Sequence, residues 1–418
     1  MQRRKFFKQL SSTIALGALS PDVISALATE TASSGKKDLL NKPVSPRAIT
    51  MWDFSWLERR WDGAGYEDWD IALDELAERG YNAVRIDAYP HLVAKDPHKK
   101  WTLHETWNQQ VWGSPDMNIV QVQPALNEFL DKCRVRDIKV GLSTWYRKDV
   151  DDIQSQTTTP QRMAEDWLAC LQTIQDAGLM DTVLYVDFCN EWPAPKFFRD
   201  QHKIPYGFWF APESIAWMKE TIEIVRKVYP DMPLLFSFDN NEAENYRRKE
   251  MDFLDLYEPH IWMVQQNNQE FYKAVGYNFE RFDPIGYKNV VAKAEKLYRE
   301  KPEYWQKLLV DKIQAIAQAA NEVGRPLITT ECWGIIDYKD WPLLDWGWVK
   351  ELCALGTITA SQTKQWAAIS TSNFCGPQFV GMWRDIEWHQ RLTSIIRKGE
   401  LSDTMFQNQN AQKLLRRL

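Results

Sequence analysis

The chain has 418 residues, a length that suits one (β/α)₈ barrel with insertions but also allows two or three ordinary domains. With 44% hydrophobic residues it can bury a large core, which argues against disorder. The formal net charge is −6 and no basic stripe stands out along the chain, so the composition argues against a nucleic-acid partner.

The first residues predict an export signal. Arg3 and Arg4 are followed, after one residue, by two phenylalanines and a lysine, which resembles the twin-arginine export signal. The modestly apolar stretch 13–27 is too short to span a bilayer as a stable helix, and it ends in a small-x-small cleavage pattern. A basic, frayed terminus is the alternative. We expect a signal peptide at 1–28, a linker at 29–47, and a periplasmic or extracellular protein without stable membrane insertion.

From residue 48 the chain alternates short β-rich runs with amphipathic helical segments, a pattern that predicts βαβ units and a parallel sheet. Several of the helical segments begin with Pro or are followed by Gly. The predicted strands are 48–53, 82–88, 139–145, 182–189, 233–238, 253–260, 326–332 and 367–374. The predicted helices between them are 66–79, 124–137, 161–177, 212–228 and 311–323.

Eight such units fit a closed α/β barrel, the (β/α)₈ or TIM barrel, better than an open sheet. No GxGxxG motif follows the first strand, which argues against a dinucleotide-binding sheet. We predict a single catalytic barrel domain at 48–400 and a C-terminal tail at 401–418. The loops 89–123 and 260–288 are unusually long, and we expect them to close one end of a cleft at the working face of the barrel.

Two of the predicted strands end in a glutamate. Asn190 and Glu191 follow the fourth strand and Glu331 ends the seventh, so these side chains are expected at the C-terminal mouth of the barrel. Hydrolysis of a glycosidic bond needs two carboxyl groups, one to protonate the leaving oxygen and one to attack the sugar or activate water. The acid needs a raised pKa, whereas the other group must stay ionised, which Arg85 nearby would favour.

These strand ends resemble clan A of the glycoside hydrolases, retaining (β/α)₈ enzymes that include cellulases. The runs 49–60 and 84–88 are similar to the bacterial "cellulase-like" branch of that clan, and the resemblance spans roughly residues 48–400. It implies that Glu191 is the acid/base and that Glu331 is the nucleophile.

The resemblance also implies residues that bind the substrate. Asn190 would hold the sugar 2-hydroxyl, and Arg85 would support the nucleophile, with a structural ion pair as its alternative role. The sixth strand offers Tyr257 and His260 near the nucleophile, and the sequence leaves open which takes which part. Trp383, after the eighth strand, is a candidate for the aromatic platform under the sugar.

Tryptophan is abundant in the chain, with 21 residues, many of them beside polar residues at predicted loop edges. Flat aromatic faces stack well on sugar rings, but tryptophan also fills cores. Further candidates for substrate contact share a place near the predicted mouth, and each of them has a structural alternative: Trp52, Asp53, Asp87, Trp145, Asp239, Asn240, Trp262 and Trp333.

We therefore expect a retaining hydrolase of β-linked oligo- or polysaccharides that needs no cofactor. One alternative is a sugar-binding barrel that has lost catalysis. A metal-dependent barrel hydrolase is disfavoured, because only His260 among six histidines ends a predicted strand and no HxH or HExxH motif is present. The six cysteines show no metal-binding spacing and are expected to be buried thiols.

Overall fold

The computed structural model describes residues 44–106, 114–239, 242–278, 284–338 and 345–418. The predicted signal peptide and residues 29–43 of the predicted linker lie outside these ranges, as does Asn240. Seven parallel strands form one sheet in the order β11-β13-β1-β2-β5-β6-β7. Their bounds are β1 (Arg47–Asp53), β2 (Ala83–Asp87), β5 (Lys139–Ser143), β6 (Val183–Asp187), β7 (Leu234–Leu235), β11 (Leu327–Thr329) and β13 (Trp366–Ser370).

Short parallel pairings close this sheet into a ring. β8 pairs with β9, β10 pairs with β12, and an isolated parallel bridge joins Tyr257 to Leu327. The fifth, sixth and seventh predicted strands are therefore each interrupted, and the eight together form the expected (β/α)₈ barrel. The closing strands are β8 (Ser237–Phe238), β9 (Glu258–Pro259), β10 (Ile261–Trp262) and β12 (Cys332–Trp333).

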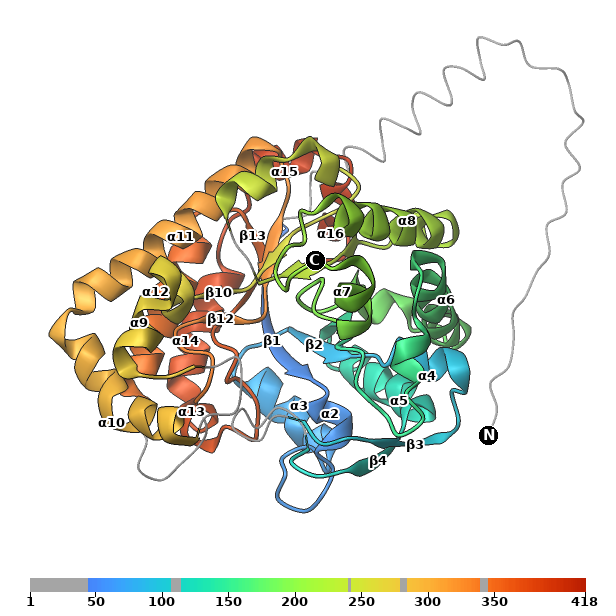
Figure 1. Ribbon diagram of the computed structural model, residues 1–418, viewed down its shortest axis with the longest axis horizontal. Coiled ribbons are helices and arrows are strands. Elements are labelled where there is room, and N and C mark those ends of the chain that lie inside the picture. The colour runs from blue at the N-terminus through green and yellow to red at the C-terminus, as the bar shows by residue number, and fades with distance from the viewer. Residues whose placement is uncertain (1–43, 107–113, 240–241, 279–283, 339–344) are drawn as a thin grey trace, which may run out of the picture. The chain divides into compact units, whose positions relative to one another are not determined.

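Helices surround the strands (Figure 1). Side chains cap two of them in the expected way: the Asp68 carboxylate accepts from the first turn of α3, and the Thr159 hydroxyl accepts from that of α6. All five predicted helices are present. The longer helices are α3 (Trp69–Glu78), α5 (Val122–Arg134), α6 (Pro160–Asp176), α8 (Pro212–Val228), α9 (Gln266–Val275), α10 (Pro284–Glu300), α11 (Pro302–Glu322), α12 (Gly347–Gln362) and α14 (Ile386–Arg397).

The long connection after β2 contains structure that its sequence did not predict. It holds a short helix and an antiparallel hairpin, and Glu58 attaches this hairpin to the barrel. The Glu58 carboxylate accepts from Arg147 at 2.8 and 2.9 Å, from Tyr89 at 3.0 Å, and from Asn118 of the hairpin at 3.3 Å. The short helix is α4 (Pro90–Lys95) and the hairpin strands are β3 (Lys100–Leu103) and β4 (Asn118–Gln121), whereas Glu58 ends α2 (Ser55–Glu58), which follows β1.

The last residues pack against the N-terminal ends of the barrel strands. Met405, Leu414 and Leu415 are buried in one apolar cluster with Ile49 and Ile328 from the strands. The segment 401–418 therefore belongs to the packed structure at the lower end of the barrel. The remaining short helices are α7 (Lys196–His202), α13 (Val380–Trp383), α15 (Asp403–Gln407) and α16 (Ala411–Leu415), with 3₁₀ turns at η1 (Ile153–Gln156), η2 (Met180–Thr182), η3 (Ala243–Arg247), η4 (Lys249–Met251) and η5 (Met263–Gln265).

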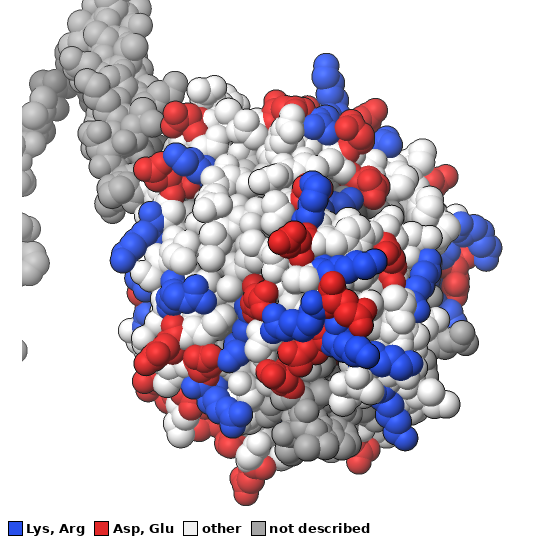
Figure 2. Space-filling model, turned by 90° about the vertical axis from the view of Figure 1, so that its left-hand side faces the viewer, with Lys and Arg blue, Asp and Glu red and all other residues white. Residues whose placement is uncertain are grey.

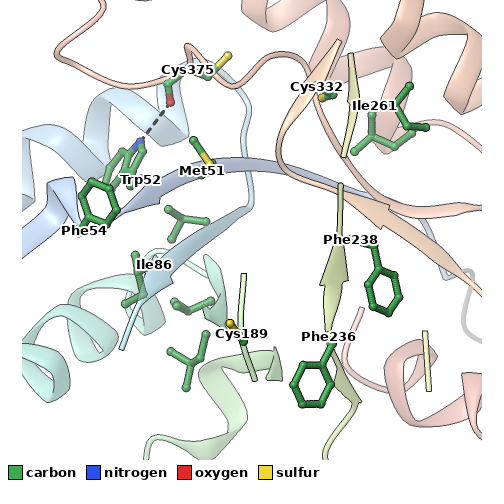
Figure 3. Packing of buried hydrophobic residues seen from close by; sticks show 14 of the residues in the cluster. Met51, Trp52, Phe54, Ile86, Cys189, Phe236, Phe238, Ile261, Cys332 and Cys375 are labelled. Atoms are coloured by element: carbon green, nitrogen blue, oxygen red, sulfur yellow. Dashed lines mark hydrogen bonds between the residues drawn. The ribbon is translucent and has the colours of Figure 1, made fainter. Parts of the chain in front are cut away.

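A second, larger apolar cluster fills the space between strands and helices. Figure 3 shows Phe238 of β8, Ile261 of β10 and Cys332 of β12 within it. Inside the barrel, a Cβ on Gly141 would lie 2.3 Å from the ring of Tyr185, so only glycine leaves room for that ring. All six cysteines are free and buried, as expected.

The outer surface carries mixed charge. On the face that includes α10 and α11, basic and acidic side chains are interspersed (Figure 2), and several form pairs such as Lys307 with Asp311 at 2.7 Å. None of the helices in the described ranges has both the length and the apolar character needed to cross a membrane.

Candidate active site

The two predicted glutamates meet at the mouth of the barrel. Glu191 lies in the loop after β6, with three residues between it and the end of the strand at Asp187, and Glu331 lies between β11 and β12. His260 lies between β9 and β10. One carboxylate oxygen of Glu191, one of Glu331 and one ring nitrogen of His260 all lie within 4.8 Å of one another. Hydrolases that retain configuration hold their two carboxyl groups about 5–5.5 Å apart.

The backbone around Glu191 is fixed by a buried aspartate beneath it. The Asp187 carboxylate accepts hydrogen bonds from the hydroxyl groups of Ser143 at 2.7 Å and Ser237 at 2.8 Å. The Ser237 hydroxyl in turn accepts from the Glu191 backbone N–H at 3.0 Å. Burial, and next the charge of Glu258, raise the pKa of Asp187 to about 6. Asp187 thus sets the position of Glu191, a role that the sequence did not reveal.

Arg85 is fully buried and joins three carboxylates. Its Nε and Nη2 atoms each lie 2.9 Å from an oxygen of Asp53, Nη2 lies 2.6 Å from Glu331 Oε1, and Nη1 lies 3.2 Å from Glu258 Oε1. The planar fork of a guanidinium suits such simultaneous pairing. Arg85 therefore holds Glu331 by one oxygen and leaves the other, Oε2, facing the mouth.

Glu258 is a buried carboxylate that sequence analysis did not single out. Besides Arg85, it accepts from the Thr330 hydroxyl, and its Oε1 lies 3.8 Å from His260 Nε2. Burial opposes its charge, but Arg85 and His260 outweigh that effect and lower the pKa of Glu258. Glu258 thus supplies negative charge beneath both cations of the site.

His260 lies between the two glutamates. Its Nδ1 atom is 3.0 Å from Glu191 Oε1 and 3.7 Å from Glu331 Oε2. Burial alone would lower the pKa of this imidazole, but the charge of Glu331 and the contacts with Glu191 and Glu258 raise it well above its ordinary value. Its surroundings therefore favour the charged imidazolium, with Nδ1 in hydrogen-bond contact with Glu191, while Nε2 lies 3.4 Å from Arg85 Nη1.

The surroundings of the two glutamates shift their pKa values in the opposite sense to the sequence-based expectation, in which Glu191 is the group with the raised pKa. Burial would raise the pKa of Glu191, but the His260 hydrogen bond and charge and the Tyr206 hydroxyl lower it. Burial raises the pKa of Glu331 to about 7; His260 and Arg85 oppose this rise and the charge of Glu191 adds to it. The His260 ring lies closer to Glu191 than to Glu331, so in the empty site a proton on the pair is favoured on Glu331 over Glu191.

Tyr206 completes the surroundings of Glu191. It lies in the connection between α7 and α8, and its hydroxyl donates to Glu191 Oε2. It also hydrogen-bonds to Asp239, which follows β8 and whose pKa burial and the charge of Glu191 raise well above its ordinary value. No periodic pattern or motif marks Tyr206 in the sequence.

Three other predicted residues lie beside this cluster. The Trp145 indole N–H donates to Asp53 Oδ2 at 2.6 Å, and this side chain is partly exposed at the mouth. Asp87 is buried and accepts from the backbone N–H groups of Tyr89 and Trp145, each at 2.7 Å, so it fixes the backbone at these two residues. Within the described residues it makes no direct bond to Arg85. The buried Asn190 Nδ2 atom has no hydrogen-bond partner among the described residues.

The structure does not place the other expected aromatic residues at the glutamates. Trp52 is buried and donates to the carbonyl of Cys375 at 3.2 Å (Figure 3). Trp333 is buried against Gly356 of α12, where an added Cβ would lie 2.5 Å from its ring, and it donates to Ser370. Trp262, on β10, is also buried, in register with Trp333. These rings fill the core between strands and helices.

Tyr257 and Trp383 likewise lie elsewhere. Tyr257 is buried next to Tyr246, with ring centroids 5.2 Å apart, so His260 is the residue of the sixth strand that reaches the glutamates. Trp383 lies on α13, where its indole N–H donates to Glu75 at 2.6 Å and Arg79 stacks over its ring at 4.3 Å. The expected sugar platform at Trp383 is therefore corrected to a contact between α13 and α3.

A closed barrel with two glutamates paired at its mouth is the arrangement of a glycoside hydrolase. The model of the sugar-binding cellulase-like family matches residues 49–397, and the chain belongs to this family. No curated protein matches the chain.

Solved structures provide further matches. A crystal structure from Parabacteroides distasonis ATCC 8503, provisionally named a glycoside hydrolase, is 62% identical with a TM-score of 0.88, and the match covers 90% of this chain and 100% of that chain. A xyloglucan-specific β-1,4-glucanase from a ruminal metagenomic library has a TM-score of 0.48 at 11% identity, covering 88% of this chain and 97% of that chain. A mannosidase from Rhizomucor miehei has a TM-score of 0.48 at 11% identity, covering 90% and 95%.

Proposed function

We propose that the protein hydrolyses β-linked glycosides with net retention of configuration. The observation that carries this proposal is the spacing of the site: one carboxylate oxygen of Glu191, one of Glu331 and one ring nitrogen of His260 lie within 4.8 Å of one another. Inverting enzymes hold their two carboxyl groups about 6.5–9.5 Å apart to admit a water molecule, so the closer spacing here favours retention. The substrate is an oligo- or polysaccharide.

In the first step Glu191 gives its proton to the glycosidic oxygen while Glu331 attacks the anomeric carbon. The bond to the leaving group breaks, and an ester forms between the sugar and Glu331. Arg85 holds Oε1 of Glu331 at 2.6 Å, so the attacking atom is Oε2. Asn190 Nδ2, buried beside this position without a partner among the described residues, is suited to bind the 2-hydroxyl of the sugar.

In the second step a water molecule gives a proton to Glu191 and attacks the anomeric carbon. The ester bond breaks and Glu331 is released as a carboxylate. Loss of the Glu331 charge in the first step removes a charge that Glu191 faces, so the proton affinity of Glu191 suits an acid before bond formation and a base after it. In the empty site the surroundings favour the proton on Glu331, so the mechanism requires that the proton lies on Glu191 once the sugar is bound.

Retention is tested by assaying the mature chain on a panel of β-linked polysaccharides and aryl β-glycosides. For any substrate cleaved, proton NMR of the first product formed gives its anomeric configuration. We expect the β-anomer to appear first. An α-anomer as the first product would contradict the mechanism. If the chain binds panel sugars by calorimetry but cleaves none, it is a carbohydrate-binding barrel instead.

Activity should fall as the pH rises through about 7. The reaction needs one proton on the carboxyl pair, and the last proton is lost near the raised pKa of Glu331, about 7. Since kcat/KM reports groups of the free enzyme, its alkaline limb is expected near this pH. The measurement is kcat/KM from pH 4 to 10, on the order of one point every half unit. A profile that stays flat above pH 8 would contradict this protonation scheme.

We further propose that the chain is exported by the twin-arginine route and acts in the periplasm or outside the cell. The adjacent Arg3 and Arg4 and the cleavage pattern at 26–28 support this. Buried free cysteines are also compatible with a protein that folds in the cytoplasm before export. N-terminal sequencing of the protein from the cell envelope and the medium tests it: a mature chain beginning at Thr29 is expected, and an uncleaved cytoplasmic chain would contradict it.

A further inference from the structure

Both carboxylate oxygens of Glu191 hold a partner in the empty site. His260 Nδ1 lies 3.0 Å from Oε1, and the Tyr206 hydroxyl donates to Oε2. A general acid, however, must point its O–H at the oxygen that it protonates, within hydrogen-bond reach. Each oxygen has two lone-pair sites, but a glycosidic oxygen that receives the proton must come within hydrogen-bond reach of one of them and so competes for space with the partner already there.

Tyr206 is the partner that can leave at the lower cost. His260 is fully buried next to a barrel strand and also lies 3.7 Å from Glu331 and 3.8 Å from Glu258. Tyr206 is 41% exposed and lies outside any helix or strand, and Arg199 lies over its ring at 5.8 Å from the centroid. Segments of this kind rearrange more readily than packed strands.

We propose that the Tyr206 hydroxyl occupies, in the empty site, the place that the leaving-group oxygen takes in the substrate complex, and that Tyr206 thereby selects the leaving group. This inference rests on the proposed function. Oε1 of Glu191 stays with His260, so the incoming oxygen must approach Oε2, where Tyr206 now lies. The displaced hydroxyl keeps its neighbour Asp239, but it loses the Glu191 oxygen to which its O–H donates and needs a new partner for that bond.

The chemistry of the leaving group decides whether that partner exists. A sugar leaving group carries several hydroxyls that can pair with Tyr206 after it moves. An aryl leaving group carries none, so the lost hydrogen bond is not replaced. Tyr206 therefore favours glycosides whose leaving group is itself a sugar, which makes oligosaccharides rather than aryl glycosides the preferred substrates.

The Tyr206→Phe variant tests this selection directly. Compared with wild type, KM for a 4-nitrophenyl β-glycoside is expected to fall by about tenfold with kcat little changed, since the phenyl ring no longer competes for Oε2. For a β-linked oligosaccharide of the same sugar, kcat/KM is expected to stay the same or fall. A drop in kcat for both substrates at unchanged KM, or an unchanged ratio between them, would overturn the proposal.

Tyr304→Phe is the matched control. Tyr304 is 38% exposed, and its hydroxyl also donates to a carboxylate, that of Glu270, at 2.6 Å. Neither residue contacts the paired glutamates in any bond recorded for the described chain. This variant is expected to leave kcat and KM for both substrates, and the thermal unfolding midpoint, unchanged. A change that appears in Tyr206→Phe alone therefore reports on the site.

A titration that needs no substrate separates this inference from the proposed function. With carbon-13-labelled glutamate side chains, the Glu191 signal is assigned by its absence in Glu191→Gln. In Tyr206→Phe the pKa of Glu191 is expected to rise by about one unit, because a donor to the carboxylate is lost. An unchanged Glu191 pKa would refute the Tyr206 contact even if glycosides are cleaved. A raised Glu191 pKa without any hydrolysis would leave the contact established and would overturn the selection proposal together with the proposed function. The other titratable groups facing Glu191, which these variants retain, are His260, Glu331, Arg85 and Asp239.

Discussion

Glu331→Gln is expected to lower kcat/KM on the best glycoside of the panel by on the order of 10⁴- to 10⁶-fold. The amide cannot form the ester with the anomeric carbon, so the covalent route is lost altogether. The loss should appear in kcat, because the amide keeps the size of the side chain. Steady-state kinetics of the variant and the wild type, prepared side by side, give the ratio.

Glu303→Gln provides the matched control, since Glu303 is exposed in the first turn of α11. It should keep the wild-type kcat/KM and thermal midpoint. If Glu331→Gln retained more than about 1% of wild-type kcat/KM with the same product anomer, Glu331 could not be the attacking group.

Arg85→Met is expected to lower the free energy of unfolding by about 3–5 kcal/mol near pH 8, the range found when one partner of a buried ion pair is removed. Arg85 is fully buried with Asp53, Glu258 and Glu331 around it. The methionine leaves these carboxylates in a low-dielectric interior without their cation. Urea unfolding followed by circular dichroism measures the loss, and activity should fall with it because Glu331 loses its support.

The pH dependence of this loss distinguishes its cause from lost packing. In the wild type the folded pKa of Glu258 is lowered. Its charge therefore stabilises the fold above the unfolded pKa, and this stabilisation is lost only as the pH falls from the unfolded pKa through the folded pKa. In the variant the carboxylates have raised folded pKa values, so their cost is relieved as the pH falls. The difference in the free energy of unfolding between variant and wild type should therefore become smaller from pH 8 to pH 5.

Arg247→Met is the control, because Arg247 pairs with Glu244 and Glu322 at the surface. Its urea midpoint should match the wild type at both pH values. A gap for Arg85→Met that is the same at pH 5 and pH 8 would mean that packing, and not buried charge, explains the effect.

The sequence predicted the barrel and the core of the site for the same reason. Parallel strands that alternate with helices must end on one side, so the glutamates at positions 191 and 331 had to meet there with Arg85 close by. His260 was predicted as part of the site, although its position between the two glutamates was not. The closed barrel was predicted from the count of eight strand–helix units.

The tryptophans were harder to place, because residue type does not reveal which way a side chain faces. Trp52 lies at an irregularity in β1, between Met51, which pairs with Arg85, and Asp53, which pairs with Ile86, so strand alternation could not predict which way its ring faces. Trp333 could not be placed by alternation, because pairing stops after β11 and restarts at β12. Trp383 lies in a helix that no pattern predicted.

Other parts of the site and fold left little trace in the sequence. Asp187 and Glu258 lie within or beside short strands, where a single acid among apolar neighbours does not show whether it faces the barrel interior. Tyr206 reaches Glu191 from an irregular connection. Helix α12 is buried on most sides and is rich in small residues, so it lacks the polar face that marks an amphipathic helix.

The central claim is that Glu331 carries the sugar during turnover. The most direct measurement is peptide mass spectrometry of the wild type after reaction with an activated 2-deoxy-2-fluoro β-glycoside of the sugar identified by the panel, a reagent whose ester intermediate breaks down slowly. We expect inactivation with one sugar attached, on the peptide that contains Glu331, and no attachment in Glu331→Gln. A sugar attached to another residue, or inactivation with no covalent sugar, would contradict the account.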